Sequence, residues 1–222
     1  MIRIMSDSDD DRVHSGPRVV SIDRSRVDRF EPPAPTVLPA TPTGQGLDVT
    51  VTWLQMQKRP LLPAPRHRAE QTAIMRAHPP TLAFYKFLYR IVGQDWCWWE
   101  RRSWDDERLQ QTIQHPDVHV YVLHVNGTPA GFAELDNRQG GDLEVTYFGI
   151  AAPFTGRGLG RYFLQWTVQT AWTFEPERVW LHTCTLDHPA ALPLYQKLGF
   201  VPYQQERQRV EDPRPLMQRP WL

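Results

Sequence analysis

The stretch from residue 142 to 164 constrains the fold more than any other part of this 222-residue chain. Residues 143–150 are rich in β-branched and aromatic side chains and predict a strand. Glycines follow at alternate positions, Gly156, Gly158 and Gly160, and apolar residues then recur at helical spacing. A strand, a glycine-rich turn and a helix start together form an anion site, because glycine lets backbone N–H groups converge and the helix N-terminus is partially positive. We therefore expect a phosphate-bearing ligand here.

The residues around these glycines disfavour the two common nucleotide motifs. A dinucleotide fingerprint, G-x-G-x-x-G, would need glycine where Arg161 or Phe163 stands. A P-loop needs Lys and then Ser or Thr after its last glycine, whereas Arg161 and Tyr162 follow Gly160. A dinucleotide-dependent oxidoreductase is therefore the weakest of the interpretations.

The glycine stretch instead resembles the acetyl-CoA loop of the GNAT superfamily of N-acetyltransferases, Gln/Arg-x-x-Gly-x-Gly/Ala. Residues 155–160 match it at both glycines, with Thr155 in place of Gln or Arg. A second block, residues 188–200, is similar to the superfamily's closing helix, Asn-x-x-Ala-x-x-Leu-Tyr-x-Lys-x-Gly-Phe, with His188 in place of Asn. The resemblance covers about residues 70–205.

This resemblance implies an α/β (α+β) fold with a mixed, mostly antiparallel sheet of about six or seven strands flanked by about four helices. It also implies an N-acetyltransferase that moves acetyl from acetyl-CoA to an amine of a small molecule or a peptide, by direct attack in a ternary complex. A non-catalytic acyl-CoA-binding or regulatory module with the same fold is the alternative.

The resemblance also assigns a cofactor site. The pantetheine is expected to pair like an added strand with the backbone around Gly149, and the pyrophosphate to meet backbone N–H groups of the glycine turn. The expected cofactor-binding residues are Phe148, Gly149, Ile150, Thr155, Gly156, Arg157, Gly158, Leu159, Gly160, Arg161, His188 and Tyr195. We expect no metal site.

For catalysis, Tyr195 occupies the position from which GNAT enzymes often protonate the departing thiolate, and a phenol stays neutral near pH 7. Glu144, on the strand before the glycine turn, is the first candidate for the base, and Glu134, on the preceding strand, is the second. Histidine is a common acid–base residue, so His182 is a further candidate. Each of these residues also has an ordinary structural interpretation, as a core aromatic, an outward carboxylate or a buried histidine. Cys184 is interpreted as structural.

Four tryptophans stand within nine residues, at Trp96, Trp98, Trp99 and Trp104. In the superfamily the connection between the first two helices lines the acceptor pocket, so these rings and His182 are the expected substrate-binding residues. Such a wall suits an aromatic, aliphatic or cationic acceptor. The equally weighted alternative is that the rings cap the core or form the interface of a homodimer.

Composition divides the chain into two parts. Residues 1–46 are polar and rich in proline, so we expect a flexible tail, and residues 47–222 a single domain. Within that domain, residues 47–56 alternate as a strand, which we expect at an edge of the sheet, and residues 57–69 form a linker. Further strands are expected at 72–77, 119–125, 130–136, 143–150, 179–185 and 201–210, and helices at 81–92, 105–114, 159–174 and 189–198.

Charge and cysteine content limit the classes of binding partner and the cellular compartment that the sequence predicts. The number of Lys and Arg residues equals the number of Asp and Glu residues, 25 each, so the chain has no net positive charge that would attract nucleic acid or an anionic membrane. Two cysteines are too few for a disulfide framework, and no long apolar run predicts a membrane span or a secretory signal. We expect a cytoplasmic protein that binds neither nucleic acid nor membrane.

Overall fold

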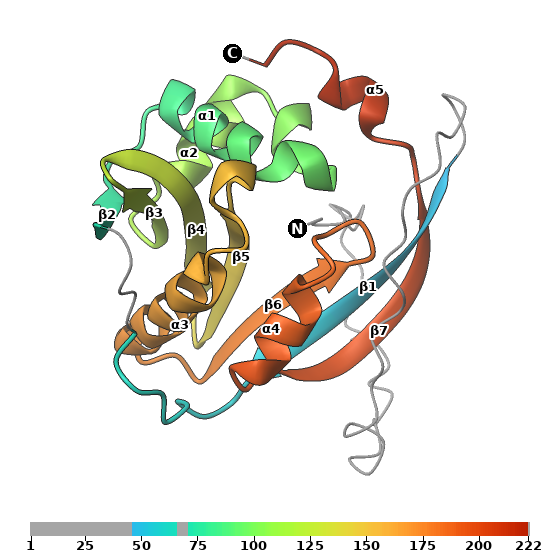
Figure 1. The fold of residues 1–222 in the computed structure, drawn as a ribbon. Helices are drawn as coiled ribbons and strands as arrows, with labels where there is room; N and C mark the ends of the chain where they lie inside the picture. Colours follow the sequence, from blue (N-terminus) through green and yellow to red (C-terminus); the bar gives the residue numbers. More distant parts are fainter. Residues whose placement is uncertain (1–45, 66–70, 222) are drawn as a thin grey trace.

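A computed structural model describes residues 46–65 and 71–221 of the chain. These residues form one seven-stranded sheet in the order β2-β3-β4-β5-β6-β1-β7, with helices packed against it (Figure 1). The strands are β1 (Leu47–Met56), β2 (Thr72–Ala77), β3 (Val118–Val125), β4 (Thr128–Gln139), β5 (Asp142–Ile150), β6 (Arg178–Cys184) and β7 (Val201–Val210). The helices are α1 (Leu82–Gly93), α2 (Asp106–Ile113), α3 (Leu159–Ala171), α4 (Ala191–Lys197) and α5 (Arg214–Met217). Short 3₁₀ turns are η2 (Gln94–Trp96), η3 (Glu100–Ser103), η4 (Ala152–Phe154) and η5 (Trp172–Phe174).

Local chemistry explains where several elements begin and turn. Thr81 caps α1, because its hydroxyl accepts a hydrogen bond from the backbone N–H of Phe84 at 3.3 Å. Asp105 caps α2 in the same way, through Arg108 N at 2.7 Å. Asn126 and Gly127 have φ angles of 49° and 80°, the left-handed conformation that a tight hairpin turn between β3 and β4 requires.

Most expected elements are confirmed, and their ends differ from the predicted ends by up to three residues. The connection between the strands predicted at 130–136 and 143–150 is shorter than expected, because β4 continues to Gln139 and only Gly140 and Gly141 turn the chain. The last helix was expected from residue 189 but begins at Ala191, and Ala190 is its N-cap without a side-chain hydrogen bond. Asp187 and His188 form hydrogen bonds of their own before the helix starts.

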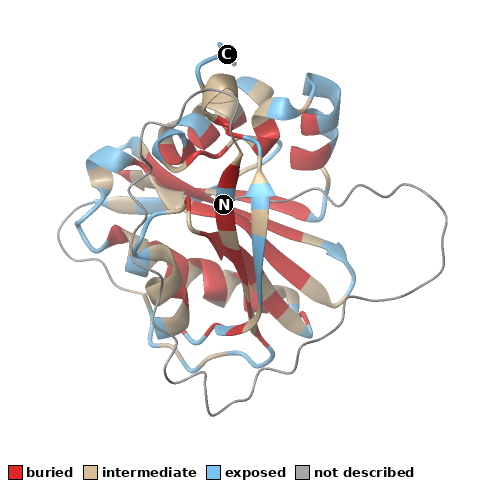
Figure 2. Ribbon diagram, turned by 90° about the vertical axis from the view of Figure 1, so that its right-hand side faces the viewer, coloured by how far each residue is buried: buried red, intermediate tan, exposed pale blue. Residues whose placement is uncertain are grey.

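The expectation of an edge strand at residues 47–56 is wrong. β1 lies inside the sheet, antiparallel to β6 on one side and to β7 on the other. Trp53, for example, faces His182 across one ladder and Gln204 across the other. Burial explains this position, because residues on both faces of β1 are covered, and buried positions dominate the centre of the sheet (Figure 2).

The sheet opens between β5 and β6. These strands pair in parallel at only three positions, the last being Glu144 with Trp180, and they separate beyond it. On its other edge β5 carries a bulge, because Glu134 pairs with Tyr147 and Leu135 with Val145, leaving Thr146 as the extra residue.

The two faces of β5 meet different helices. A Cβ at Gly149 would meet Val92 of α1, whereas the neighbouring Phe148 packs against Phe163 of α3 and Tyr195 of α4. Successive strand residues point to opposite faces, so α1 covers one face and α3 with α4 the other. This arrangement places the gap between β5 and β6 at the centre of the molecule.

Some expectations concern residues that the structure does not describe. The predicted tail, apart from Gly46, and part of the predicted linker lie outside the described residues. Within the described ranges, none of the helices is both long enough and apolar enough to cross a membrane.

Candidate functional site

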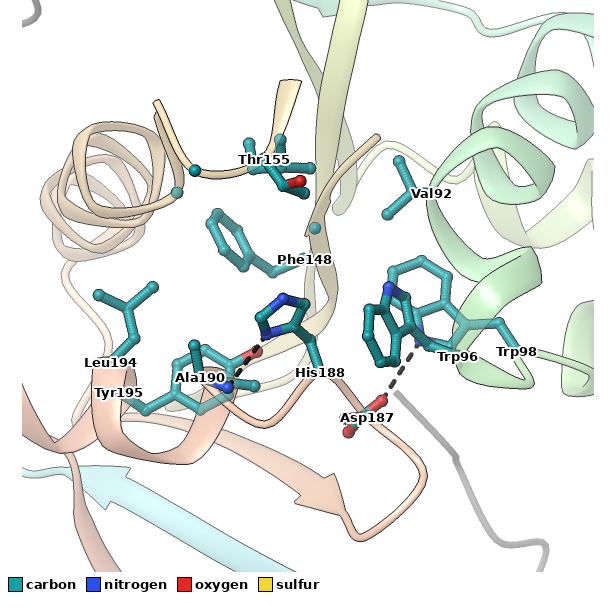
Figure 3. A pocket seen from close by; sticks show the side chains of 15 residues that line it. Val92, Trp96, Trp98, Phe148, Thr155, Asp187, His188, Ala190, Leu194 and Tyr195 are labelled. Atoms are coloured by element: carbon teal, nitrogen blue, oxygen red, sulfur yellow. Dashed lines mark hydrogen bonds between the residues drawn. The ribbon is translucent and has the colours of Figure 1, made fainter. Parts of the chain in front are cut away.

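A cavity of about 190 Å³ lies where β5 and β6 separate (Figure 3). It is bounded by the end of α1, the tryptophan segment, β5, the glycine turn and the segment from β6 into α4. Its lining residues are Val92, Trp96, Trp98, Phe148, Gly149, Ile150, Thr155, Gly156, Gly160, Asp187, His188, Ala190, Ala191, Leu194 and Tyr195. The two blocks that carry the family resemblance therefore meet around one cavity.

The glycine turn has the conformation that an anion cradle needs. Gly156 and Gly158 have φ angles of 76° and 78°, which side chains other than glycine rarely adopt. A Cβ built on either glycine would meet nothing within 4 Å, so the turn faces open space that a ligand can enter. Gly158 directly precedes α3, whose first N–H groups have no partner within the helix.

The predicted cofactor residues divide into two groups. Those that line the cavity are Phe148, Gly149, Ile150, Thr155, Gly156, Gly160, His188 and Tyr195. Arg157, Gly158, Leu159 and Arg161 do not line it. Leu159 is fully buried in the core, and the guanidinium of Arg157 lies 5.2 Å from the ring centre of Phe154.

Tyr195 is almost fully buried, at 3% exposure, and reaches the cavity from α4. Burial, and after it the carboxylate of Asp187, raises the pKa of its hydroxyl well above the usual value. The hydroxyl therefore stays protonated at neutral pH and can donate a proton or a hydrogen bond into the cavity.

The opposite wall comes from two of the four tryptophans. Nε1 of Trp98 donates to Oδ1 of Asp187 at 3.4 Å, and the ring of Trp96 meets His188 edge-on with centroids 4.7 Å apart (Figure 3). His188 Nδ1 in turn accepts from the backbone N–H of Ala190 at 3.0 Å. These contacts hold the wall in place across the gap between the two halves of the sheet.

The other two tryptophans do not reach the cavity. The ring of Trp104 lies 4.0 Å from the guanidinium of Arg101 and 4.0 Å from that of Arg108, and Trp99 precedes η3. Their interpretation as substrate-binding residues therefore has no support from the geometry of this cavity.

Glu144 and His182 form a buried pair at the closed end of the gap. Oε1 of Glu144 lies 3.7 Å from Nδ1 of His182, and both side chains are about 5% exposed. The His182 ring lies near both Trp53 and Trp180, with both centroid distances 6.4 Å. Neither residue lines the cavity itself, although Glu144 occupies the last paired position before the strands separate.

Glu134 lies in a different environment from the one expected of a base. Its carboxylate accepts hydrogen bonds from Nη2 of Arg101 and from the hydroxyl of Tyr85, both at 2.5 Å, and all three residues are fully buried. Burial disfavours the charge of Arg101, but the Glu134 carboxylate and the neighbouring tyrosines together outweigh it and raise the pKa of the guanidinium. Because both carboxylate oxygens are engaged and the residue lies outside the cavity, we assign Glu134 to the core.

Sequence reasoning missed several cavity residues. Asp187 is the most polar of them, and its other oxygen accepts from Thr183 Oγ1 at 2.7 Å and from Cys184 N at 2.9 Å. Val92, Ala190, Ala191 and Leu194 supply apolar surface. Asp187 had a local signal in its place directly before His188, and Ala191 and Leu194 had one as matched positions of the closing-helix pattern.

The cavity thus combines a glycine turn at a helix start, a protonated phenol, and an edge of β5 that pairs with no other strand among the described residues. The sequence matches the acetyltransferase (GNAT) family over residues 83–200, more than half of the chain. Among curated proteins, none matches it significantly.

Several solved structures are similar to this chain at low sequence identity. A GNAT-family protein from Novosphingobium aromaticivorans has a TM-score of 0.51 and 14% identity, over 78% of this chain and 69% of that one. A protein of unknown function from Staphylococcus epidermidis has a TM-score of 0.49 and 16% identity over 75% of this chain, and the match spans only 63% of that protein's length. An aminoglycoside acetyltransferase from an uncultured soil sample has a TM-score of 0.47 and 17% identity, over 58% of this chain and 87% of that one. The first of these likenesses shows a shared fold, and the family match shows that this chain belongs to the GNAT acetyltransferase family.

Proposed function

We propose that the chain transfers an acetyl group from acetyl-CoA to an amine of a small molecule or a peptide, by direct attack in a ternary complex. The observation that carries this proposal is the single cavity that joins the glycine turn, the free edge of β5 and Tyr195. The equal numbers of acidic and basic residues do not favour a strongly charged polymer as acceptor.

The residues present fit acetyl-CoA. The open cradle at Gly156 and Gly158, which a Cβ would fill, suits the pyrophosphate, together with the N–H groups at the start of α3. The unpaired edge of β5 near Gly149 suits the amides of the pantetheine, which would pair with it as an added strand. When bound, acetyl-CoA supplies the thioester whose carbonyl carbon the amine attacks.

Tyr195 is the proposed proton donor. Its hydroxyl reaches the cavity, and its raised pKa keeps it protonated and therefore available as a donor. The sulfur leaving the thioester would accept a hydrogen bond from this phenol as negative charge develops on it, and would then take the proton, which Tyr195 would regain from solvent.

Glu144 is the proposed proton acceptor, with His182 as its partner. The carboxylate and the imidazole are 3.7 Å apart at the closed end of the gap, close enough for the carboxylate charge to stabilise a proton that the pair would accept from an amine. Because neither side chain lines the cavity, we propose that the proton reaches the pair through water.

The cavity also fits the alternative, a non-catalytic acyl-CoA-binding module, because neither Glu144 nor His182 lines it. Such a module needs the cradle and the strand edge but no base within the cavity. It would bind acetyl-CoA without releasing thiol in the presence of any amine.

One experiment separates these functions. Calorimetric titration with acetyl-CoA, CoA and NAD should show binding of the first two only. Thiol release should then be measured with acetyl-CoA and a panel of alkyl, aryl and peptide amines. Release with one amine class supports the enzyme, binding without release supports the module, and failure to bind any CoA species refutes both.

A further inference from the structure

The indole of Trp98 spans the gap between the two halves of the sheet. On one side, a Cβ built at Gly149 on β5 would lie 3.4 Å from Cη2 of the Trp98 ring. On the other side, Nε1 of Trp98 donates a hydrogen bond at 3.4 Å to Asp187, which follows β6 in the chain. At this level β5 and β6 no longer pair with each other. Trp98 therefore closes the gap on the face that α1 covers (Figure 3).

The Trp98 ring packs against three other aromatic rings on the side away from the cavity. Its centroid lies 5.4 Å from that of Tyr89, 5.2 Å from Tyr147 and 6.0 Å from Phe132. None of these three rings lines the cavity, and Trp98 itself is only 3% exposed. Trp98 is thus a partition that separates the cavity from the cluster of Tyr89, Phe132 and Tyr147.

The partition stands opposite the proposed reaction centre. Phe148 and Tyr195 approach the cavity from the face that α3 and α4 cover, and Trp98 with Val92 approaches it from the other face. If Tyr195 protonates the departing sulfur, the acyl group of the thioester must lie between these walls. An acyl chain that extends toward α1 would meet the fixed indole.

From this geometry we propose that Trp98 restricts the acyl group to short chains, and that Asp187 holds the indole in the restricting position. The inference rests on the proposed function and adds to it the residue that selects the acyl chain. A longer chain overpacks the wall, a kind of misfit that costs about 1–3 kcal/mol, so we expect about tenfold weaker binding of hexanoyl-CoA than of acetyl-CoA.

Removing the indole should reverse this preference. Trp98→Ala leaves an apolar space lined by Tyr89, Phe132 and Tyr147, which an aliphatic chain can fill. Each buried methylene then strengthens binding by about fourfold, the factor that corresponds to about 0.8 kcal/mol. The variant should bind hexanoyl-CoA more tightly than acetyl-CoA.

The test is calorimetric titration of the full chain and its variants with acetyl-, butyryl- and hexanoyl-CoA, a readout that needs no acceptor amine. Trp98→Leu serves as a second variant that keeps part of the apolar volume, so that loss of folding in Trp98→Ala does not end the test. Trp104→Ala is the matched control, because Trp104 lies outside the cavity between two guanidinium groups. It should keep the wild-type dependence on chain length.

Two results overturn the inference alone. One is a wild-type protein that binds hexanoyl-CoA as tightly as acetyl-CoA, and the other is folded Trp98 variants that discriminate against hexanoyl-CoA as the wild type does. Failure of the wild type to bind any acyl-CoA would overturn the proposed function and this inference together. A reversal of preference in either Trp98 variant but not in Trp104→Ala supports it.

Discussion

Replacing Tyr195 by Phe removes one oxygen atom from the proposed reaction centre and leaves the ring in place. The ring contacts that fix it, with Phe148 at 6.5 Å and Phe200 at 6.1 Å between centroids, do not involve the hydroxyl. Within the described part of the chain, no group is hydrogen-bonded to this hydroxyl. The free energy of unfolding should therefore change by less than about 1 kcal/mol.

The expected effect on turnover is much larger. A positioned general acid contributes about 10²–10⁴-fold to a rate, so kcat of Tyr195→Phe should fall by about this factor while the Kd for acetyl-CoA stays within about twofold. The raised pKa of Tyr195 adds a second expectation. Because the phenol keeps its proton beyond its ordinary pKa of about 10, ionisation of Tyr195 should cause no loss of kcat in the wild type below that pH.

Thiol release at saturating acetyl-CoA and amine measures kcat, calorimetry measures Kd, and thermal unfolding checks the fold. Tyr121→Phe is the control, because Tyr121 lies on β3, where its ring packs 5.0 Å from that of Trp166 and outside the cavity. A wild-type kcat in Tyr195→Phe would refute proton donation by this residue. An equal fall in acetyl-CoA affinity and in kcat would show instead that the hydroxyl acts in binding.

Three other substitutions test the cradle, the core and the response to acid. Gly158→Glu should abolish acetyl-CoA binding in calorimetry, whereas Gly127→Glu, at a hairpin glycine with a φ of 80° and equally open space, should bind normally although it introduces the same charge and backbone strain. Glu134→Ala should lower the free energy of unfolding in urea by about 3–5 kcal/mol, because it leaves the buried Arg101 charge without its carboxylate; a loss below about 1 kcal/mol would contradict this account. Burial lowers the pKa of His119 to about 4, so protonation favours the unfolded chain, and stability should be full above pH of about 6.5 and decline toward pH 4. His119→Phe should flatten that decline in urea titrations, and an unchanged slope would assign it to other groups.

Much of the fold could be predicted because its signals are local. Caps at Thr81 and Asp105, the turn at Asn126 and Gly127, and the alternation of β5 each depend on neighbours in the sequence. The position of β1 could not be predicted in this way. Alternation shows which residues of a strand are buried, but not which strands lie beside it, and that choice depends on pairing with β6 and β7 more than 100 residues later.

The same distinction between local signals and long-range packing applies to the residues of the site. The glycine turn and Tyr195 lie in contiguous motifs, and the structure brings them to one cavity. Glu134 looked equivalent to Glu144 as a strand carboxylate, but a buried Arg101 from a distant turn decides its role. Composition also could not separate Trp98 from Trp104, because only the path of the chain through η2 and η3 determines which ring faces the cavity.

The two departures from the family pattern have physical explanations in this chain. The hydroxyl of Thr155 donates to the carbonyl of Ala152 at 2.9 Å, so this residue closes the turn locally. The proposed anion cradle would consist of backbone groups, which do not depend on the missing Gln or Arg. His188 accepts from Ala190 N through Nδ1, which in a neutral imidazole leaves the proton on Nε2. Figure 3 shows this ring projecting into the cavity, so His188 offers both an acceptor to the backbone and a donor to a ligand, the two capacities of an Asn side chain. We therefore propose that a cradle made of backbone N–H groups, and a histidine in place of an amide, would let the site bind acetyl-CoA despite both substitutions.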